Sequence, residues 1–144
     1  MLRATRMLSV VLAGAIAVGT IGVQGLHAGE EYKPEQYQAK MTALMKTALA
    51  GMPGTEAHMI RVEVPPGWIG GKHYHQGHVI VYVLEGAMRF ELDGQAPITV
   101  GAGEVFHERS GEVMRARNVS ADTELKFMVF QLNPEGQPLM IKAE

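Results

Sequence analysis

The stretch that decides the fold runs from Gly67 to Gly86: Gly-Trp-Ile-Gly-Gly-Lys-His-Tyr-His-Gln-Gly-His-Val-Ile-Val-Tyr-Val-Leu-Glu-Gly. It carries three imidazoles, at His73, His75 and His78, followed directly by an unbroken apolar run. Alternate side chains of a strand share a face, so His73 and His75 are expected to reach one point in space. Because neutral imidazole is the commonest protein ligand of metals, this stretch predicts a metal site beside an apolar strand.

Short strands separated by glycine turns are predicted around this stretch. Apolar and polar residues alternate in several of them, and Asp93-Gly94 is a hairpin signal. Many short strands preceded by one helix favour a small antiparallel barrel or sandwich. The predicted strands cover residues 57–64, 79–84, 88–92, 98–100, 104–108, 112–119 and 125–132.

The one predicted helix covers residues 35–49. Met41, Leu44, Met45 and Ala48 fall on one face at helical spacing. A proline just before this segment suits a first helical turn, and the glycine and proline after it suit a helix end. The pattern predicts a helix that packs its apolar stripe on the sheet, with methionine as gap filler.

The opening stretch also resembles the first motif of the cupin superfamily, in which a glycine, a His-x-His pair, a glutamate and a second glycine follow at set spacings. Gly67, His73, His75 and Gly86 fall in register with that motif. The position of the motif's glutamate holds Val79 instead. The resemblance therefore carries over two of the ligands of this motif and leaves out the carboxylate.

A later stretch resembles the second cupin motif. Gly103, Gly111 and Asn118 match it, whereas Arg109 stands where proline is usual and Met114 stands where histidine is usual. The resemblance covers roughly residue 50 to the C-terminus. It implies an all-β fold, a double-stranded β-helix or jelly-roll barrel, here with one N-terminal helix.

The resemblance implies one divalent metal inside the barrel, held in related proteins by three histidines and a glutamate. His73 and His75 carry over, and Met114 offers a thioether in place of the third imidazole. A further nitrogen is expected from His78, re-aimed by a turn or bulge, or else from His107 on a later strand. The alternatives remain a surface position for either histidine and a core position for Met114.

This donor set bears on the metal and on the function. Soft sulfur with imidazole favours copper or zinc, and the missing carboxylate disfavours iron and manganese. An enzyme would need a general base, and Glu112, on the face of Met114, is the one acid expected inside the barrel. This slightly favours binding over catalysis. Three functions stay open: a protein that binds a metal and a small organic ligand, a small metal-dependent oxygenase- or isomerase-type enzyme, and a metal-free jelly roll that binds a ligand or partner.

Composition limits the partners. The chain has 144 residues, enough for one domain with a real core, and its lack of cysteine excludes disulfides and thiolate metal sites. A formal net charge of −2 gives no indication of a nucleic-acid partner. The run from Val79 to Leu84 is apolar on both faces of its strand, which predicts cover by a second layer or a homodimer partner.

The N-terminus has the layout of a cleaved secretory signal peptide. Arg3 and Arg6 precede an apolar stretch, and Ala28 provides a small residue at the expected cleavage point. An uncleaved membrane anchor is the alternative. The chain is thus divided into a signal peptide at 1–28, an extension with the helix at 29–54 and the barrel at 55–144, which predicts a periplasmic or secreted protein.

Overall fold

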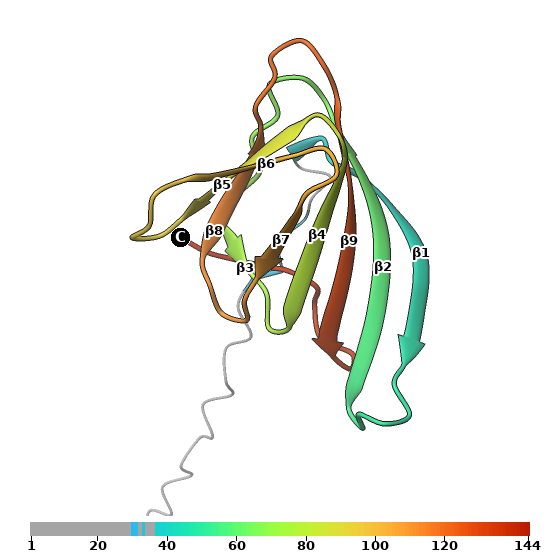
Figure 1. The fold of residues 1–144 in the computed structure, drawn as a ribbon. Helices are drawn as coiled ribbons and strands as arrows, with labels where there is room; N and C mark the ends of the chain where they lie inside the picture. Colours follow the sequence, from blue (N-terminus) through green and yellow to red (C-terminus); the bar gives the residue numbers. More distant parts are fainter. Residues whose placement is uncertain (1–29, 32, 34–36) are drawn as a thin grey trace, which may run out of the picture.

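Two antiparallel five-stranded sheets face each other in the computed structural model, which describes residues 30, 31, 33 and 37–144 (Figure 1). The first sheet has the order β1-β2-β9-β4-β7. Its strands are β1 (Lys40–Ala48), β2 (Thr55–Val64), β9 (Leu125–Pro134), β4 (His78–Glu85) and β7 (Val105–Glu108).

The second sheet has the order β10-β3-β8-β5-β6. Its strands are β10 (Ile141–Lys142), β3 (His73–Tyr74), β8 (Met114–Asn118), β5 (Ala87–Leu92) and β6 (Ile98–Gly101). Sequential strands are distributed between the two sheets, as in a jelly roll. The predicted all-β jelly-roll fold and its strands are confirmed.

The core is formed by the alternate side chains that point between the two sheets. Val79, Val81 and Val83 of β4 are at most 1% exposed. Phe90 of β5 stacks on Phe106 of β7 with ring centroids 4.1 Å apart, and this contact ties the two sheets together. The alternation of Met88, Phe90 and Leu92 read from the sequence identifies the inward face of β5 correctly, since all three side chains are buried.

The predicted helix over residues 35–49 is wrong for residues 40–48, which form the edge strand β1; residues 35 and 36 lie outside the described residues. Leu44 is 53% and Met45 40% exposed, so the expected apolar stripe is not buried. Antiparallel pairing with β2, interrupted by a bulge between Ala43 and Met45, satisfies the backbone instead. The hydrogen bonds and packing gained by pairing with the free edge of β2 outweigh the weak helical preference of this segment.

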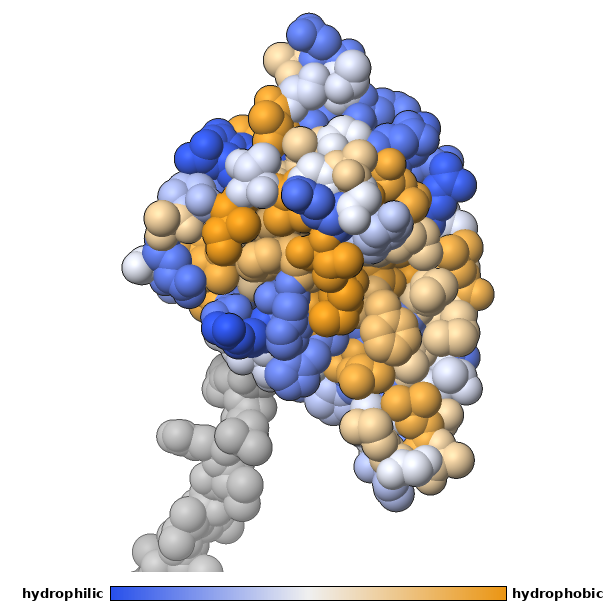
Figure 2. Space-filling model, viewed as in Figure 1, coloured by the Kyte–Doolittle hydropathy of each residue, from blue (hydrophilic) through white to orange (hydrophobic). Residues whose placement is uncertain are grey.

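The outer face of β4 is exposed, because no other described part of the chain covers it. Tyr82 is 43% and Leu84 40% exposed, and the apolar surface continues across β9 and β2, where Ile80 pairs with Phe130 and Phe130 with Met59. Figure 2 shows apolar side chains gathered on the surface over β9, β2 and β1. Pairing of two copies through this face stays a prediction, which light scattering at micromolar concentration would contradict by giving only monomer mass.

Asn118 organises the loop that leads into the histidine stretch. Its amide nitrogen donates to the carbonyl oxygens of Pro65, at 3.1 Å, and Thr123, at 2.7 Å. Its amide oxygen accepts a hydrogen bond from the backbone nitrogen of Ser120 at 3.0 Å. This buried residue, matched by the family resemblance, thus has a structural role.

The predicted signal peptide at residues 1–28 lies outside the described residues, so cleavage and export stay predictions. Within the part of the chain that the structure describes, no helix is long and apolar enough to cross a membrane.

Candidate metal centre

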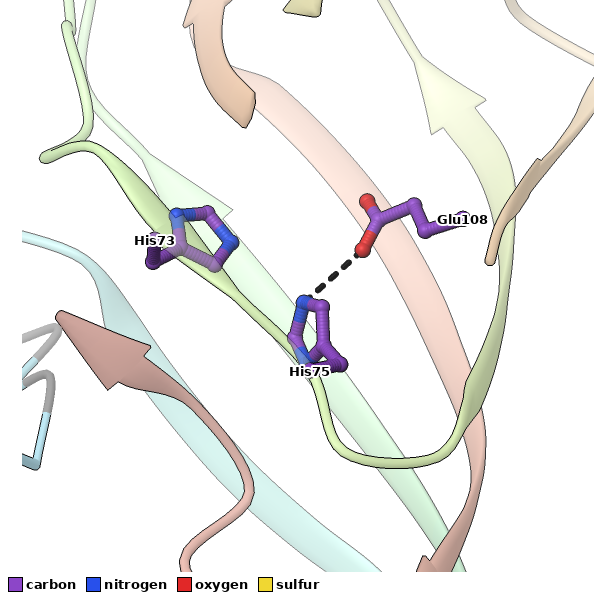
Figure 3. Close-up of side chains that lie close together, drawn as sticks. All are labelled: His73, His75 and Glu108. Carbon is purple, nitrogen blue, oxygen red and sulfur yellow. Dashed lines mark ion pairs between the residues drawn. The ribbon is translucent and has the colours of Figure 1, made fainter. Parts of the chain in front are cut away.

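Three buried side chains converge between the two sheets: His73, His75 and Glu108 (Figure 3). His73 begins β3, His75 follows that strand directly, and Glu108 ends β7 of the opposite sheet. Each offers one ligand atom, and these atoms all lie within 4.8 Å of one another. The two histidines share a face as the sequence predicts, and their rings meet edge to face at a centroid distance of 5.0 Å.

Glu108 supplies a carboxylate from an unexpected strand. It lies directly opposite Val79 in the antiparallel pairing of β4 with β7. Directly opposite residues of an antiparallel pair share a face, so Glu108 points into the barrel beside the position where the family motif has its glutamate. The carboxylate that is missing from β4 is replaced by one from the neighbouring strand.

Backbone carbonyls orient both rings. Nδ1 of His73 donates to the carbonyl oxygen of Gly71 at 2.9 Å, and Nδ1 of His75 donates to that of Leu139 at 2.7 Å. The same Leu139 oxygen accepts from the amide nitrogen of Gln131 at 2.8 Å. These bonds place the Nδ1 protons outside the centre and leave the Nε2 atoms as the ligands, which is how proteins commonly hold metal-binding imidazoles.

The contact between His75 and Glu108 calls for a positive charge. Nε2 of His75 lies 2.8 Å from Oε2 of Glu108, an ion-pair distance, but Oε2 has no hydrogen-bond donor in good geometry among the described residues. Because Nδ1 carries the proton of neutral His75, Nε2 can donate only when the ring is charged. A buried carboxylate without a partner is costly, so the pair needs either a proton on His75 or a cation. The donor set therefore fits a metal ion.

The pKa values of the two histidines are shifted in opposite directions in the metal-free protein. Burial lowers the pKa of His73, and neighbouring His75 lowers it further. Burial also acts to lower the pKa of His75, but the negative charge of Glu108 in close contact with its ring, together with the Leu139 carbonyl, outweighs burial and raises it. One ring is thus held neutral and the other favours the proton that a metal would displace.

Replacing Glu108 with glutamine should reverse the shift of His75. In metal-free protein, we expect NMR titration to place the pKa of His75 above the ordinary value of 6.5 in the wild type and below it in Glu108→Gln. A raised pKa stabilises the fold fully below about pH 6.5 and progressively less as the pH rises through the folded value. The variant should therefore lose this contribution mainly at acid pH, and a His75 pKa that stays raised in Glu108→Gln would contradict the assignment.

A protein-family model for the cupin domain matches residues 60–131, which span both motifs and all three side chains of the centre. The chain belongs to the cupin family. No curated protein matches it.

Solved structures share the cupin fold at low identity. An RmlC-like cupin family protein from Methanocaldococcus jannaschii has a TM-score of 0.55 and 22% identity, covering 72% of this chain and 87% of its own. The polyketide cyclase RemF from Streptomyces resistomycificus has a TM-score of 0.58 and 21% identity, covering 81% and 76%. The DMSP lyase DddQ from Ruegeria pomeroyi DSS-3 has a TM-score of 0.58 and 19% identity, covering 73% and 51%.

Of the other predicted ligands of this cupin, Met114 lies next to the centre, whereas His78 and His107 lie outside it. Met114 is fully buried on β8, directly opposite His73, and belongs to the apolar core; its role as a ligand stays a prediction. His78 and His107 are both exposed, with Nδ1 of His78 3.1 Å from Nε2 of His107. Neither belongs to the inner group, because the pairing of β4 with β7 turns both to the outer face, opposite to Val79 and Glu108.

Sequence reasoning missed Glu108 and considered Glu112 instead. Glu112 accepts hydrogen bonds from the backbone nitrogen and guanidinium of Arg109, outside the inner group. The signal for Glu108 was its spacing of two residues from inward-facing Phe106, but the inward face of that strand could be chosen only once its partner was known.

A small apolar cavity adjoins the centre of this cupin. It measures about 70 Å³ and is only partly enclosed. Its walls come from both sheets and from the segment before β10, and they are almost entirely apolar apart from the three centre residues and Gln131. Such a cavity has room for several waters or for part of a small organic molecule. Its walls include Met41, Ile60, Trp68, Val81, Met88, Ala116, Phe127 and Leu139.

Proposed function

We propose that this cupin holds one divalent transition metal ion with His73, His75 and Glu108 and binds a small, mostly apolar organic molecule beside it. The observation that carries the proposal is the buried Oε2 of Glu108, which faces an imidazole nitrogen at 2.8 Å and has no hydrogen-bond donor in good geometry among the described residues. Three ligands converge from two sheets, and both rings are already oriented by backbone carbonyls. A site prepared in this way loses little freedom when an ion binds.

Glu108 changes the expected preference among metals. Two imidazoles and one carboxylate form a donor set that zinc accepts in open sites and that iron(II) accepts in sites with free positions. We therefore propose zinc or iron(II) in place of the copper that a thioether from Met114 would favour. With three protein ligands the ion keeps open positions, where it would polarise an oxygen of the bound molecule.

The cavity indicates the chemistry of that molecule. Its apolar walls favour a short alkyl or alkenyl part, and the ion favours an oxygen such as that of a carboxylate or carbonyl. A short-chain carboxylate such as butyrate combines these two features and is a suitable probe.

A metal-dependent enzyme is the second candidate. The open coordination positions favour it, and two fold neighbours are named as a lyase and a cyclase. Against it, the described residues around the cavity include no acid or base other than the three candidate ligands. Binding without turnover is therefore the primary proposal. Metal-dependent consumption of a small organic acid, or substrate-dependent oxygen uptake, would favour the enzyme.

Two variants separate the ion from the cavity. Glu108→Gln should lose the metal, measured by elemental analysis of purified protein, and with it the binding of butyrate. Ala116→Leu fills the cavity from β8 without altering a ligand, so it should keep one metal per chain and lose butyrate. Wild-type protein that contains no zinc or iron after purification and takes up neither ion in dialysis would contradict the proposal, as would butyrate binding that survives both changes.

A further inference from the structure

Two histidines that take no part in the inner centre lie together on the outer face of the first sheet. His78 begins β4 and His107 lies in β7, and both are exposed. Their ring centroids are 5.2 Å apart, and Nδ1 of His78 lies 3.1 Å from Nε2 of His107. We propose that this pair is a second metal site, which takes an ion of the copper(II) class.

The sheet itself holds the two rings together. In the antiparallel pairing of β4 with β7, His107 lies opposite Ile80, and His78 stands two residues from Ile80 on the same face. Such diagonal neighbours are within reach of long side chains. On its other side His78 pairs with Leu132 of β9, so β4 is fixed by a strand on each side. The pair therefore rests on paired strands, which position ligands better than loops do.

The distance between the nitrogens suits one ion. Two nitrogens about 2.0–2.1 Å from a common ion, at an angle of about 90–110°, lie about 2.8–3.4 Å apart. The observed 3.1 Å, which is a hydrogen bond between the two rings in the metal-free protein, lies within that range. The sheet thus keeps two imidazole nitrogens at the spacing of neighbouring ligands.

The donor set distinguishes this pair from the inner centre. In the described part of the chain, the only group of three or more potential ligands is the inner one, so the outer pair offers two imidazoles and no carboxylate. Copper(II) binds nitrogen ligands most tightly among the divalent first-row ions, whereas manganese(II) prefers oxygen. Copper(II) should therefore load the outer pair, and manganese(II) should not. This inference does not depend on the function proposed for the inner centre.

The test is calorimetric titration of the full chain with copper(II). His78→Gln and His107→Gln should each remove one copper ion per chain or weaken its binding by about tenfold or more, because each deletes one of two ligands. The double variant should be no weaker than either single variant, since the two rings act as one unit. His58→Gln is the matched control: this histidine is hydrogen-bonded to Glu56 at 2.8 Å and should leave the outer binding unchanged.

Two further measurements keep the result decisive. His73→Gln/His75→Gln should retain the outer copper ion, and circular dichroism shows whether that variant is folded. Should it not fold, manganese(II) titration of wild type, His78→Gln and His107→Gln serves instead, and the three proteins should bind equal amounts. Copper isotherms that are the same in wild type, His78→Gln and His107→Gln would overturn the proposal, as would losses from the two single variants that simply add.

Discussion

Zinc in hundredfold excess over its dissociation constant should raise the free energy of unfolding by about 2.7 kcal/mol, because the ion binds the folded chain and not the unfolded one. For a domain of this size that corresponds to a rise of about 10 °C in Tm. The rise has its origin in the meeting of His73 and His75 with Glu108, which lies far from them along the chain and joins them only in the folded protein. Differential scanning calorimetry with and without zinc, after removal of metal by chelation, measures it.

Variants of the centre assign this rise to particular atoms. Glu108→Gln and His73→Gln should abolish it, since each removes one of three ligands. Glu112→Gln is the matched control, because Glu112 is an acid on the neighbouring turn that bonds to Arg109 outside the centre. Met114→Leu keeps the volume of a core residue and tests its predicted role as a ligand: a smaller rise would support that role. A wild-type Tm that zinc does not change, or an undiminished zinc-induced rise in Tm in Glu108→Gln, would contradict the assignment of these three residues as metal ligands.

Gly77→Ala should be the most destabilising small substitution in this region, by about 3 kcal/mol or more. A Cβ at Gly77 would overlap the carbonyl oxygen of Leu132 and lie 2.7 Å from its carbonyl carbon and 3.1 Å from Cα of Asn133. These are backbone atoms of β9, so no side-chain rotation relieves the contact. Urea denaturation measures the change in the free energy of unfolding.

The same substitution should also weaken the metal centre. The displaced end of β9 carries Gln131 and Asn133, whose amide nitrogens donate to the carbonyls of Leu139 and Gln137. The Leu139 carbonyl also orients His75, so a shift of β9 reaches the ligand. We therefore expect a smaller zinc-induced rise in Tm for Gly77→Ala. Gly51→Ala is the control: a Cβ there meets nothing within 4 Å, so its stability should change by less than about 1 kcal/mol. Equal stabilities of the two variants would contradict the close approach.

Much of the fold could be predicted from local patterns. The alternation in residues 57–64 and 88–92 and the glycine turns around them identified strands and their inward faces, because burial on one face imposes a period of two on any strand. The spacing of His73 and His75 likewise placed two ligands on one face. The limit of this reasoning was reached in residues 40–48, where a few apolar residues at helical spacing could not reveal that β2 offers a free edge to pair with.

The sequence by itself determined the β-rich class, the positions of most of the strands and the two histidines that share a point in the barrel. Only the tertiary structure decided that Glu108 completes the centre and that His78 and His107 form a separate pair on the outer face. The reason is the register between β4 and β7. Periodicity tells which residues of one strand share a face, but which face turns inward, and which residue lies opposite Val79, depends on long-range pairing that no local pattern contains.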